Sequence, residues 1–273
     1  MNFYKPRNLD DLFLKLKDSQ NYFLAGGTDI NVQLKRDFIK QGNIFYINHL
    51  AELKGIEERD DKIFIGALTT YHQLLSSGII KEHFKFLRKA LDKFASPLIT
   101  TMATLGGNIA NGSPTNDVTP PLLVLDAELE LISKQGSRII QLSDFFIGYK
   151  KFLLKENELI KSIIIKKNAE QDYISFYEKV GARNTLTIAK VSVACMKKVQ
   201  NGILKEVKIA VGSLNEYPRR LIKMEEYLTG NQNVNITELD EILKQEITPI
   251  SDLRSDKEYR YQVCLNLIEE FVL

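Results

Sequence analysis

The chain has 273 residues, and its hydrophobic (44%) and charged (26%) fractions are those of a folded globular protein, which excludes a disordered one. Its 37 basic and 35 acidic residues give a net charge of +2, so the composition shows no electrostatic sign of nucleic-acid binding. No apolar run approaches the roughly 20 residues that span a bilayer, and the N-terminal segment lacks the apolar core of a signal peptide, so we expect a soluble, cytoplasmic protein without a membrane partner.

The N-terminal segment has the pattern of a βαβ unit. Apolar residues at helical spacing predict a helix over residues 9–16, and a short apolar strand over 22–25 runs directly into Gly26-Gly27. A second helix is expected at Ile30 to Leu34, just after the glycines, and a buried strand follows at residues 44–47. The strand–turn–helix–strand order implies that the two strands pair in parallel.

The middle of the chain combines strands with one clear helix, for which apolar residues keep helical spacing from Phe84 to Phe94. The stretch from Met102 to Pro121 is rich in Gly, Asn, Thr, Ser and Pro and is expected to be a long loop, followed by a short helix over 121–125. Loops of this length inside compact domains are usually functional. Strands are predicted over residues 62–68, 129–133 and 162–166.

The polar stretch from Lys166 to Asp172 is the best candidate for a domain boundary, and we place the two domains at residues 1–168 and 169–273. Beyond this boundary, apolar runs flank Asn201-Gly202 and predict a β-hairpin with a type I′ turn, formed by residues 191–199 and 203–211. The pattern that follows is helical, so the C-terminal third is predicted to be a small α+β domain.

Three helices are expected near the C-terminus. The first covers residues 219–228 and stops at Gly230, and the second covers 238–247. The third is predicted to begin at Ser255, because Glu258 three residues later completes the pattern of a capping box.

The cysteine and histidine residues give no sign of a metal or cluster site. Cys195 and Cys264 lie far apart in apolar segments and are expected to be buried thiols. Two cysteines cannot supply the four ligands that an iron–sulfur cluster normally takes. The three histidines show no metal-ligand spacing, so no metal site is predicted.

Two short segments have the chemistry of an anion-binding loop. Each places a Gly-Gly pair beside small polar residues, in LAGGTD (residues 24–29) and TLGGNI (residues 104–109). Glycine permits positive φ and lets a ligand approach the backbone, and successive N–H groups in such turns bind anions. Each segment alone would be better explained as a tight turn, but two of them favour a dinucleotide. Neither matches the Rossmann or the P-loop pattern.

These segments resemble a known family. LAGGTDINVQLK and, further along the chain, ATLGGNIANGSPTNDVTPPLLVLDAELEL are similar to the paired motifs of the FAD domain of molybdenum hydroxylases, which include xanthine, nicotinate and aerobic CO dehydrogenases and aldehyde oxidases. Residues 176–190, 209–219 and 252–260 also resemble family sequences. The resemblance implies an α+β fold, with a two-part FAD-binding domain of the vanillyl-alcohol-oxidase type (a small βαβ subdomain and a larger mixed one) and a small C-terminal α+β domain.

The resemblance also implies which residues contact FAD. The first glycine loop would hold the pyrophosphate and ribityl region mainly through backbone N–H groups, the second would form another cradle, and Asp117 would accept hydrogen bonds from ribityl hydroxyls. The resemblance implies that Phe94 makes an aromatic contact with the flavin and that Ile160 contacts the adenine end through its backbone. It also implies that Lys179 makes a cationic contact and that Ile188 packs against the ring face. The implied FAD-binding residues are Leu24, Ala25, Gly26, Gly27, Thr28, Asp29, Ile30, Asn31, Phe94, Thr104, Leu105, Gly106, Gly107, Asn108, Asp117, Ile160, Lys179 and Ile188.

Four of these residues also have an ordinary structural explanation. Phe94 and Ile160 fit the core side of a helix and a strand, Asp117 fits an Asx turn, and Lys179 fits a solvated surface lysine.

The family resemblance implies an oxidoreductase subunit that needs no catalytic side chain or metal ligand of its own, because FAD carries the redox chemistry. In this family, electrons pass from a molybdenum centre through iron–sulfur clusters to FAD and then to NAD(P)+ or another acceptor. The chain has neither cluster cysteines nor molybdopterin-binding sequence, so molybdopterin and the 2Fe–2S clusters are expected on a molybdenum-cofactor subunit and an iron–sulfur subunit of a hetero-oligomer. Xanthine or another purine is the expected substrate, with aldehydes and N-heterocycles left open. The alternatives are a self-contained flavin oxidoreductase of the vanillyl-alcohol-oxidase fold and an assembly subunit that has lost its flavin.

Overall fold

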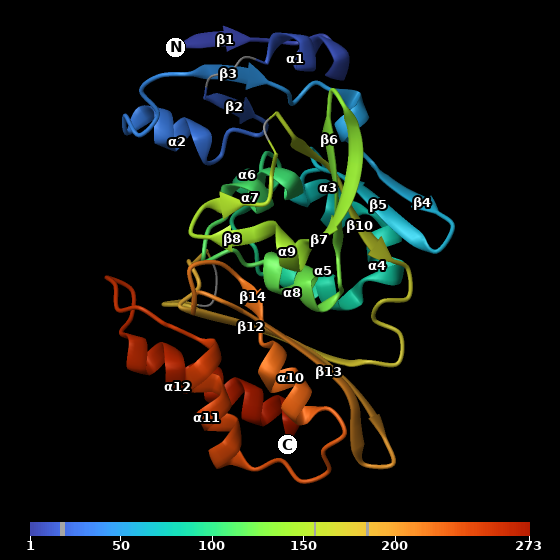
Figure 1. Ribbon diagram of the computed structural model, residues 1–273, viewed down its shortest axis with the longest axis vertical. Helices are drawn as coiled ribbons and strands as arrows, with labels where there is room; N and C mark the ends of the chain where they lie inside the picture. Colours follow the sequence, from blue (N-terminus) through green and yellow to red (C-terminus); the bar gives the residue numbers. More distant parts are fainter. Residues whose placement is uncertain (17–19, 156, 184–185) are drawn as a thin grey trace.

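The computed structural model describes residues 1–16, 20–155, 157–183 and 186–273. Three parts follow one another along the long axis, with the N-terminal sheet at one end and the C-terminal helices at the other (Figure 1). The buried apolar residues form three clusters, which include Phe45, Ile63 and Val193, respectively, and the cluster of Ile63 extends onto the C-terminal sheet through Ala194 and Ala210. The pocket described below lies where the middle part meets the C-terminal part.

The N-terminal part is the predicted βαβ unit. Its strands pair in parallel in the order β1 (Asn2–Tyr4), β3 (Asn43–Tyr46), β2 (Asn21–Leu24), which confirms the expected pairing of β2 with β3. The helices are α1 (Leu9–Lys15) and α2 (Ile30–Lys35), and α1 begins where the Asn8 side chain accepts from the Asp11 backbone. A short 3-10 helix, η1 (Ala51–Leu53), leads into the middle part.

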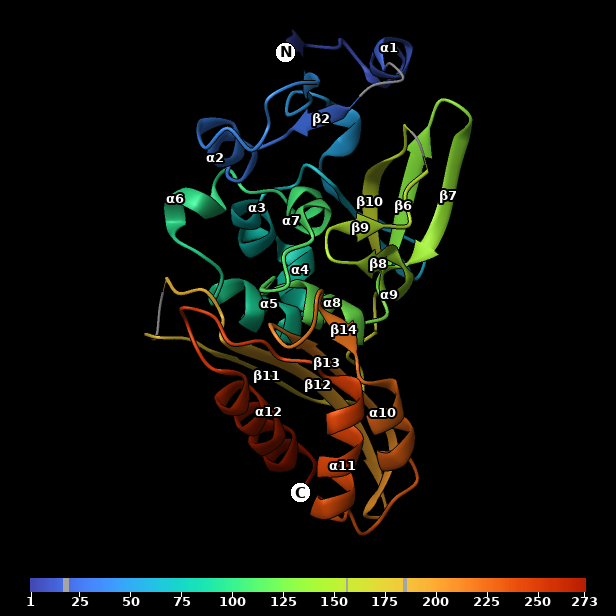
Figure 2. The ribbon, with the colours of Figure 1, turned by 60° about the vertical axis from the view of Figure 1, so that its left-hand side comes forward.

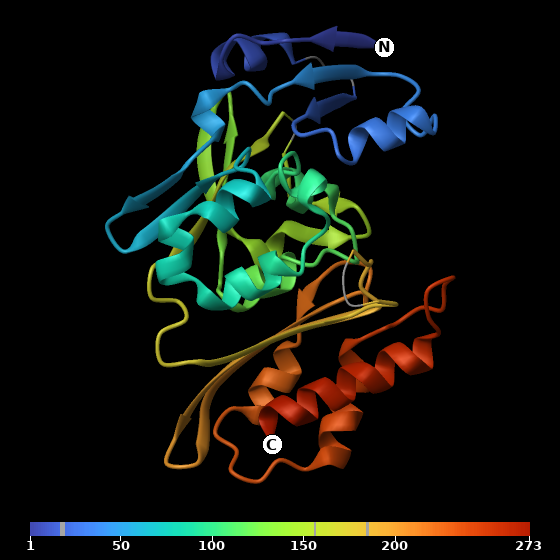
Figure 3. The same ribbon diagram turned by 180° about the vertical axis from the view of Figure 1, so that it is seen from behind.

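The middle part contains a five-stranded antiparallel sheet with helices packed beside it (Figure 3). Its strand order is β4 (Ile56–Arg59), β5 (Lys62–Gly66), β10 (Leu159–Lys166), β6 (Glu128–Ser133), β7 (Gly136–Gln141). The predicted central helix is α5 (Lys85–Asp92). Besides α7, described below, the elements of the middle part that the sequence did not predict are α3 (Tyr71–Ser76), α4 (Gly78–His83), α6 (Pro97–Thr100), α9 (Leu142–Phe145), β4, β7, β8 (Phe146–Gly148) and β9 (Lys151–Phe152).

The expectation of one long loop over residues 102–121 is wrong. The segment contains α7 (Leu105–Asn111), and α8 (Thr119–Val124) begins before its end. Helix α7 forms because the Thr104 side chain accepts from the Gly107 backbone at its N-terminus, and because Gly106 packs against the backbone of Ala67. Local composition disfavours a helix here, but these tertiary contacts stabilise one.

The C-terminal part is a four-stranded antiparallel sheet in the order β11 (Ile174–Val180), β12 (Val191–Gln200), β13 (Ile203–Gly212), β14 (Arg219–Arg220). The β12–β13 hairpin is confirmed, and Asn201 and Gly202 both have the positive φ that a type I′ turn requires. Helix α8 of the middle part contacts β12 and β13, and the C-terminal helices lie across the same sheet (Figure 2). These helices are α10 (Ile222–Leu228), α11 (Ile236–Glu246) and α12 (Lys257–Val272).

Two predicted helix starts are corrected. Arg219 and Arg220 pair with β13 and form β14. Helix α10 therefore begins at Ile222, three residues later than expected. The cap of α12 is Asp256, whose side chain accepts from the Tyr259 backbone, and the expected capping box at Ser255 is absent. Among the described residues, no helix combines the length and apolar character needed to cross a bilayer.

Candidate functional site

The first glycine loop joins β2 to α2 and presents free backbone donors. Within the described residues, the N–H groups of Gly27, Thr28, Asp29 and Ile30 have no hydrogen-bond acceptor. All four residues are partly exposed, and Gly27 has a φ of +73°, a conformation that a residue with a Cβ rarely adopts. Free, solvent-facing N–H groups in a tight turn suit an anion such as a phosphate.

The first glycine loop lies directly against the segment that precedes the second. A Cβ added at Gly26 would lie 1.7 Å from the carbonyl oxygen of Met102, so only glycine allows this contact. The backbone of Ala103 in turn donates to the carbonyl of Ile99 in α6, at 2.7 Å. The fold therefore brings the two glycine segments together, with α6 beside them.

The second glycine segment differs from the first, because its backbone N–H groups are used inside the chain. Those of Leu105 and Gly106 donate to the carbonyls of Thr69 and Ala67, and those of Gly107 and Asn108 donate to Thr104. These four N–H groups are therefore not available to a ligand. What the segment offers instead is the exposed backbone of Gly107 and the buried Oδ1 atom of Asn108, which has no partner within the described residues.

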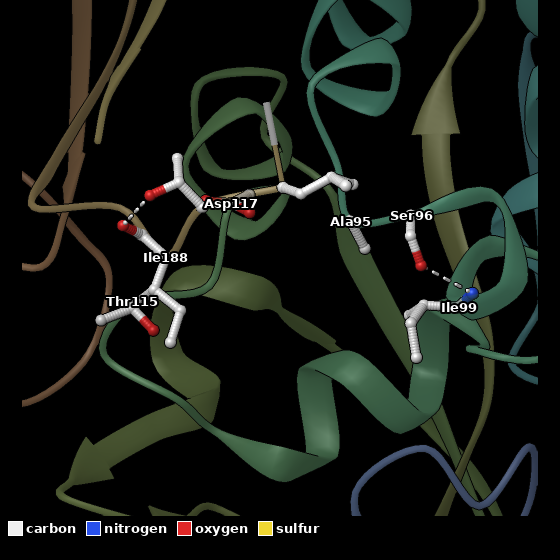
Figure 4. A pocket seen from close by; sticks show the side chains of 8 residues that line it. Ala95, Ser96, Ile99, Thr115, Asp117 and Ile188 are labelled. Atoms are coloured by element: carbon white, nitrogen blue, oxygen red, sulfur yellow. Dashed lines mark hydrogen bonds between the residues drawn. The ribbon is translucent and has the colours of Figure 1, made fainter. Parts of the chain in front are cut away.

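A pocket of about 320 Å³ opens beside α6 (Figure 4). One wall comes from the α5–α6 connection and α6, where Ser96 caps the helix by accepting from the Ile99 backbone. The opposite wall comes from the segment between α7 and α8 and from the segment that leads into β12. The lining residues are Ala95, Ser96, Ile99, Thr115, Asp117, Leu186, Thr187 and Ile188.

Asp117 and Lys179 form a buried ion pair at this pocket. The Lys179 Nζ donates to Asp117 Oδ2 at 2.7 Å and to the carbonyl of Lys93 at 3.1 Å, and its side chain is only 4% exposed. Burial raises the pKa of Asp117 to about 6, against the lowering effect of Lys179. The other carboxylate oxygen, Oδ1, is buried and has no partner within the described residues. An acceptor of this kind is suited to a hydroxyl donor on a ligand.

The remaining residues implied by the resemblance lie at different distances from the pocket. Ile188 lines it with a half-exposed side chain, and Phe94 immediately precedes the lining residue Ala95. Phe94 also stacks on buried Tyr71, with ring centroids 3.8 Å apart, so it belongs partly to the core. Ile160 is a core residue of β10, a strand that packs against α7.

The sequence did not reveal the α6 side of the pocket or the contact at Met102. The pair Ser96-Pro97 is a helix-start signature and was the available signal for α6. Thr115 was also missed, although it stands two residues before Asp117. Leu186 and Thr187 line the pocket only because β11 and β12 bring them next to α6.

The described residues contain no group of histidine, cysteine and acidic side chains that could hold a metal ion. Cys195 and Cys264 are free and buried, as expected, and burial raises the pKa of each thiol. These thiols are therefore unreactive core residues. The site therefore offers free N–H donors, unpaired acceptor oxygens and an open pocket. These groups fit a nucleotide that carries phosphates and sugar hydroxyls.

Comparisons with known proteins identify the nucleotide. Residues 1–166 match the family of the FAD binding domain in molybdopterin dehydrogenase, and residues 176–273 match the CO dehydrogenase flavoprotein C-terminal domain. The chain is 30% identical to the xanthine dehydrogenase FAD-binding subunit of Escherichia coli O157:H7, over 99% of this chain and 94% of that protein. It is 30% identical to the nicotinate dehydrogenase FAD-subunit of Eubacterium barkeri, over 84% of this chain and 79% of that protein.

A solved structure agrees with these matches. The carbon monoxide dehydrogenase from Hydrogenophaga pseudoflava that lacks the Mo-pyranopterin moiety superimposes with a TM-score of 0.90 at 26% identity, covering 98% of this chain and 94% of that chain. The C-terminal part of the chain matches a domain of CO dehydrogenase flavoproteins, which argues against a self-contained flavin oxidoreductase. The chain belongs to the family of FAD-binding subunits of molybdenum hydroxylases, which are oxidoreductases.

Proposed function

We propose that this chain binds one FAD non-covalently along the first glycine loop and the pocket at Asp117, and that it serves as the electron outlet of a molybdenum hydroxylase. In this role it accepts electrons from an iron–sulfur subunit and delivers them to NAD(P)+ or another acceptor. The observation that carries the proposal is the combination of four free N–H groups in the loop with the unpaired Oδ1 of buried Asp117. When bound, FAD supplies the redox chemistry, which no side chain here provides.

The first glycine loop would hold the pyrophosphate. The free N–H groups of residues 27–30 donate to phosphate oxygens, and the absence of side chains at Gly26 and Gly27 lets the ligand approach the backbone. Asn31 borders the same turn, because a Cβ added at Gly27 would lie 2.5 Å from its Nδ2 atom. Leu24, Ala25 and Asn31 therefore complete the loop around the phosphates.

Asp117 would accept a hydrogen bond from a ribityl hydroxyl through Oδ1. The neighbouring Lys179 donates to Oδ2 and favours the ionised carboxyl, so the unpaired oxygen stays an acceptor. This geometry supports an indirect role for Lys179, since its ammonium group already has two partners in the chain. The Oδ1 of Asn108 is the second unpaired acceptor and would take a further hydroxyl donor, beside the exposed backbone of Gly107.

The flavin ring would lie against Ile188, a residue that is 49% exposed and lines the pocket. Phe94 would support this region from the core side through its stack on Tyr71. Ile160 would act at the adenine end through its backbone, because its side chain is buried in the core.

The partners are proposed by analogy with the relatives named above, which are FAD subunits of dehydrogenases. We therefore propose a hetero-oligomer with a molybdenum-cofactor subunit and an iron–sulfur subunit, located in the cytoplasm, with xanthine or another purine as the substrate. We also place the boundary between the two domains of this chain within residues 166–172.

The experiment uses the isolated, FAD-loaded chain. It should consume NADH or NADPH in the presence of a tetrazolium or quinone dye, and it should hydroxylate no purine or aldehyde. Adding the partner subunits should produce substrate-dependent dye reduction, and the subunits should co-elute. Acid precipitation should release all of the yellow colour, since the described residues that line the pocket include no histidine or cysteine to tether the flavin.

Two results would count against the proposal. Substrate turnover by this chain alone would favour a self-contained flavin oxidoreductase, and a well-folded chain that stays colourless after incubation with FAD would favour a subunit without flavin. A flavin-loaded chain that oxidises neither nicotinamide would exclude NAD(P)+ and leave ferredoxin or a quinone as the acceptor.

A further inference from the structure

A buried arginine of the C-terminal domain reaches the segment that forms one pocket wall. Arg260 lies in the first turn of α12, and its side chain is 2% exposed. Its Nη1 donates to the carbonyls of Lys190 (2.9 Å) and Ser213 (3.1 Å), and its Nη2 donates to Asp252 Oδ1 (2.8 Å). Burying a guanidinium is unfavourable unless hydrogen bonds compensate for the lost water. The bonds to the carbonyls of Lys190 and Ser213 provide part of this compensation and link α12 to the segments that contain these two residues.

Ser213, one of these two targets, is itself bonded to both of the segments that form this wall. Its backbone N–H donates to the carbonyl of Pro114 at 2.8 Å, and its hydroxyl donates to the carbonyl of Ala189 at 3.1 Å. Pro114 directly precedes the lining residue Thr115, and Ala189 directly follows Ile188. Ser213 also has a φ of +68°, an unfavourable conformation for serine that its surroundings must enforce.

We infer that Arg260 is a positioning residue for FAD: through Ser213 and Lys190 it holds the wall segments 113–117 and 186–190 at the spacing that receives the flavin. Arg260 does not line the pocket and acts only through these backbone contacts. The C-terminal domain would thus set the shape of a cofactor site whose glycine loops belong to the N-terminal half. This inference rests on the proposed position of the flavin.

The Asp252 carboxylate fixes the other end of the guanidinium. It accepts from the backbones of Arg254 and Ser255 and from the Arg260 side chain. Burial raises its pKa, but these hydrogen bonds outweigh burial, and the pKa is lowered below the usual value. Asp252 therefore stays ionised at neutral pH and orients Arg260 towards the two carbonyls.

The test compares Arg260→Met and Arg260→Lys with two matched controls. Arg254→Met removes another arginine that pairs with Asp252, but within the described structure Arg254 is half exposed and does not donate to the carbonyls of Lys190 or Ser213. Ile268→Ala creates a cavity in the same helix, at a side chain that is fully buried, and so lowers stability without touching the walls. Each full-length variant is saturated with FAD, and three quantities are measured: the visible circular dichroism of the flavin, the FAD dissociation constant and the amide exchange of residues 186–191.

Arg260→Met should change the flavin dichroism, weaken FAD binding about tenfold and speed amide exchange in the 186–191 segment. Arg260→Lys should fall between Arg260→Met and wild type, because lysine keeps the charge but not the fork of donors. Both controls should keep the wild-type flavin spectrum. If Arg260→Met does not fold, Arg260→Lys is compared with wild type and with the two controls by the same three measurements.

A wild-type flavin spectrum and exchange pattern in both Arg260 variants would overturn the inference. The same spectral change in Ile268→Ala would also overturn it, since general destabilisation would then explain the effect. The variant Ile188→Asp shows whether the positioning role of Arg260 or the proposed position of the flavin is wrong. Unchanged FAD affinity in Ile188→Asp would refute the position itself, whereas weakened affinity there with normal Arg260 variants would refute only the positioning role.

Discussion

The affinity of the chain for FAD is expected to fall as the pH is lowered through about 6, because Asp117 then loses its charge. Burial raises the pKa of Asp117 to about 6, and its unpaired Oδ1 is the atom proposed to accept from FAD. Protonation replaces a charged acceptor with a neutral and weaker one. The nearby phenols of Tyr71 and Tyr177 do not titrate in this range, because burial and then Asp117 raise the pKa of each well above 10.0.

The size of the effect follows from the pKa. If only the ionised form of Asp117 binds FAD tightly, the dissociation constant rises in proportion to the loss of carboxylate. With a pKa of about 6, about one chain in ten carries the carboxylate at pH 5, so FAD should bind about tenfold more weakly at pH 5 than at pH 8.

Fluorescence quenching of FAD, titrated across this pH range, measures the dissociation constants. Asp117→Asn is the matched control, because it keeps the shape of the side chain but cannot ionise. Its affinity should be low and independent of pH. A wild-type affinity that stays constant from pH 5 to pH 8, or an Asn variant that keeps the wild-type slope, would refute the reasoning.

Three further predictions concern stability and the glycine loops. The pKa of Asp117 is raised from its ordinary 3.8 to about 6, so its contribution to the stability of the FAD-free fold is fully present below pH 3.8 and is lost as the pH rises through about 6. Denaturant unfolding should show that the free energy of unfolding falls by up to about 3 kcal/mol over this range, and a difference between wild type and Asp117→Asn that does not change with pH would contradict the prediction. Gly26→Ala should weaken FAD binding at least about tenfold, because its Cβ would overlap the Met102 carbonyl; Gly78→Ala, where a Cβ meets nothing within 4 Å, should bind FAD like wild type. Arg220→Met should lower the free energy of unfolding by about 3 kcal/mol, because it leaves buried Glu225 without its ion-pair partner; an unchanged melting temperature would contradict this.

The sequence was most informative where local chemistry decides the structure. The βαβ unit and the β12–β13 hairpin were both predicted, because alternation of apolar residues and the Asn201-Gly202 turn act over short distances. The first glycine loop was predicted for the same reason. Its free N–H groups follow from a tight turn that needs positive φ at Gly27.

Structure that depends on distant contacts was not predictable in this way. Helix α7 forms in a Gly- and Asn-rich stretch because Gly106 packs against Ala67, a contact that no local pattern reveals. The cap of α12 was misplaced by one residue, because Ser255 and Asp256 are both good capping residues and only tertiary structure selects between them. The pocket joins α6 to residues 186–188, which are far apart along the chain.

A crystal structure of the FAD-loaded chain, at a resolution that locates the phosphates, tests the central claim most directly. The account predicts pyrophosphate oxygens within hydrogen-bond distance of the N–H groups of residues 27–30, a ribityl hydroxyl on Asp117 Oδ1 and the flavin ring against Ile188. A flavin found away from this pocket, or phosphates held by side chains elsewhere with the N–H groups of residues 27–30 facing solvent, would contradict it.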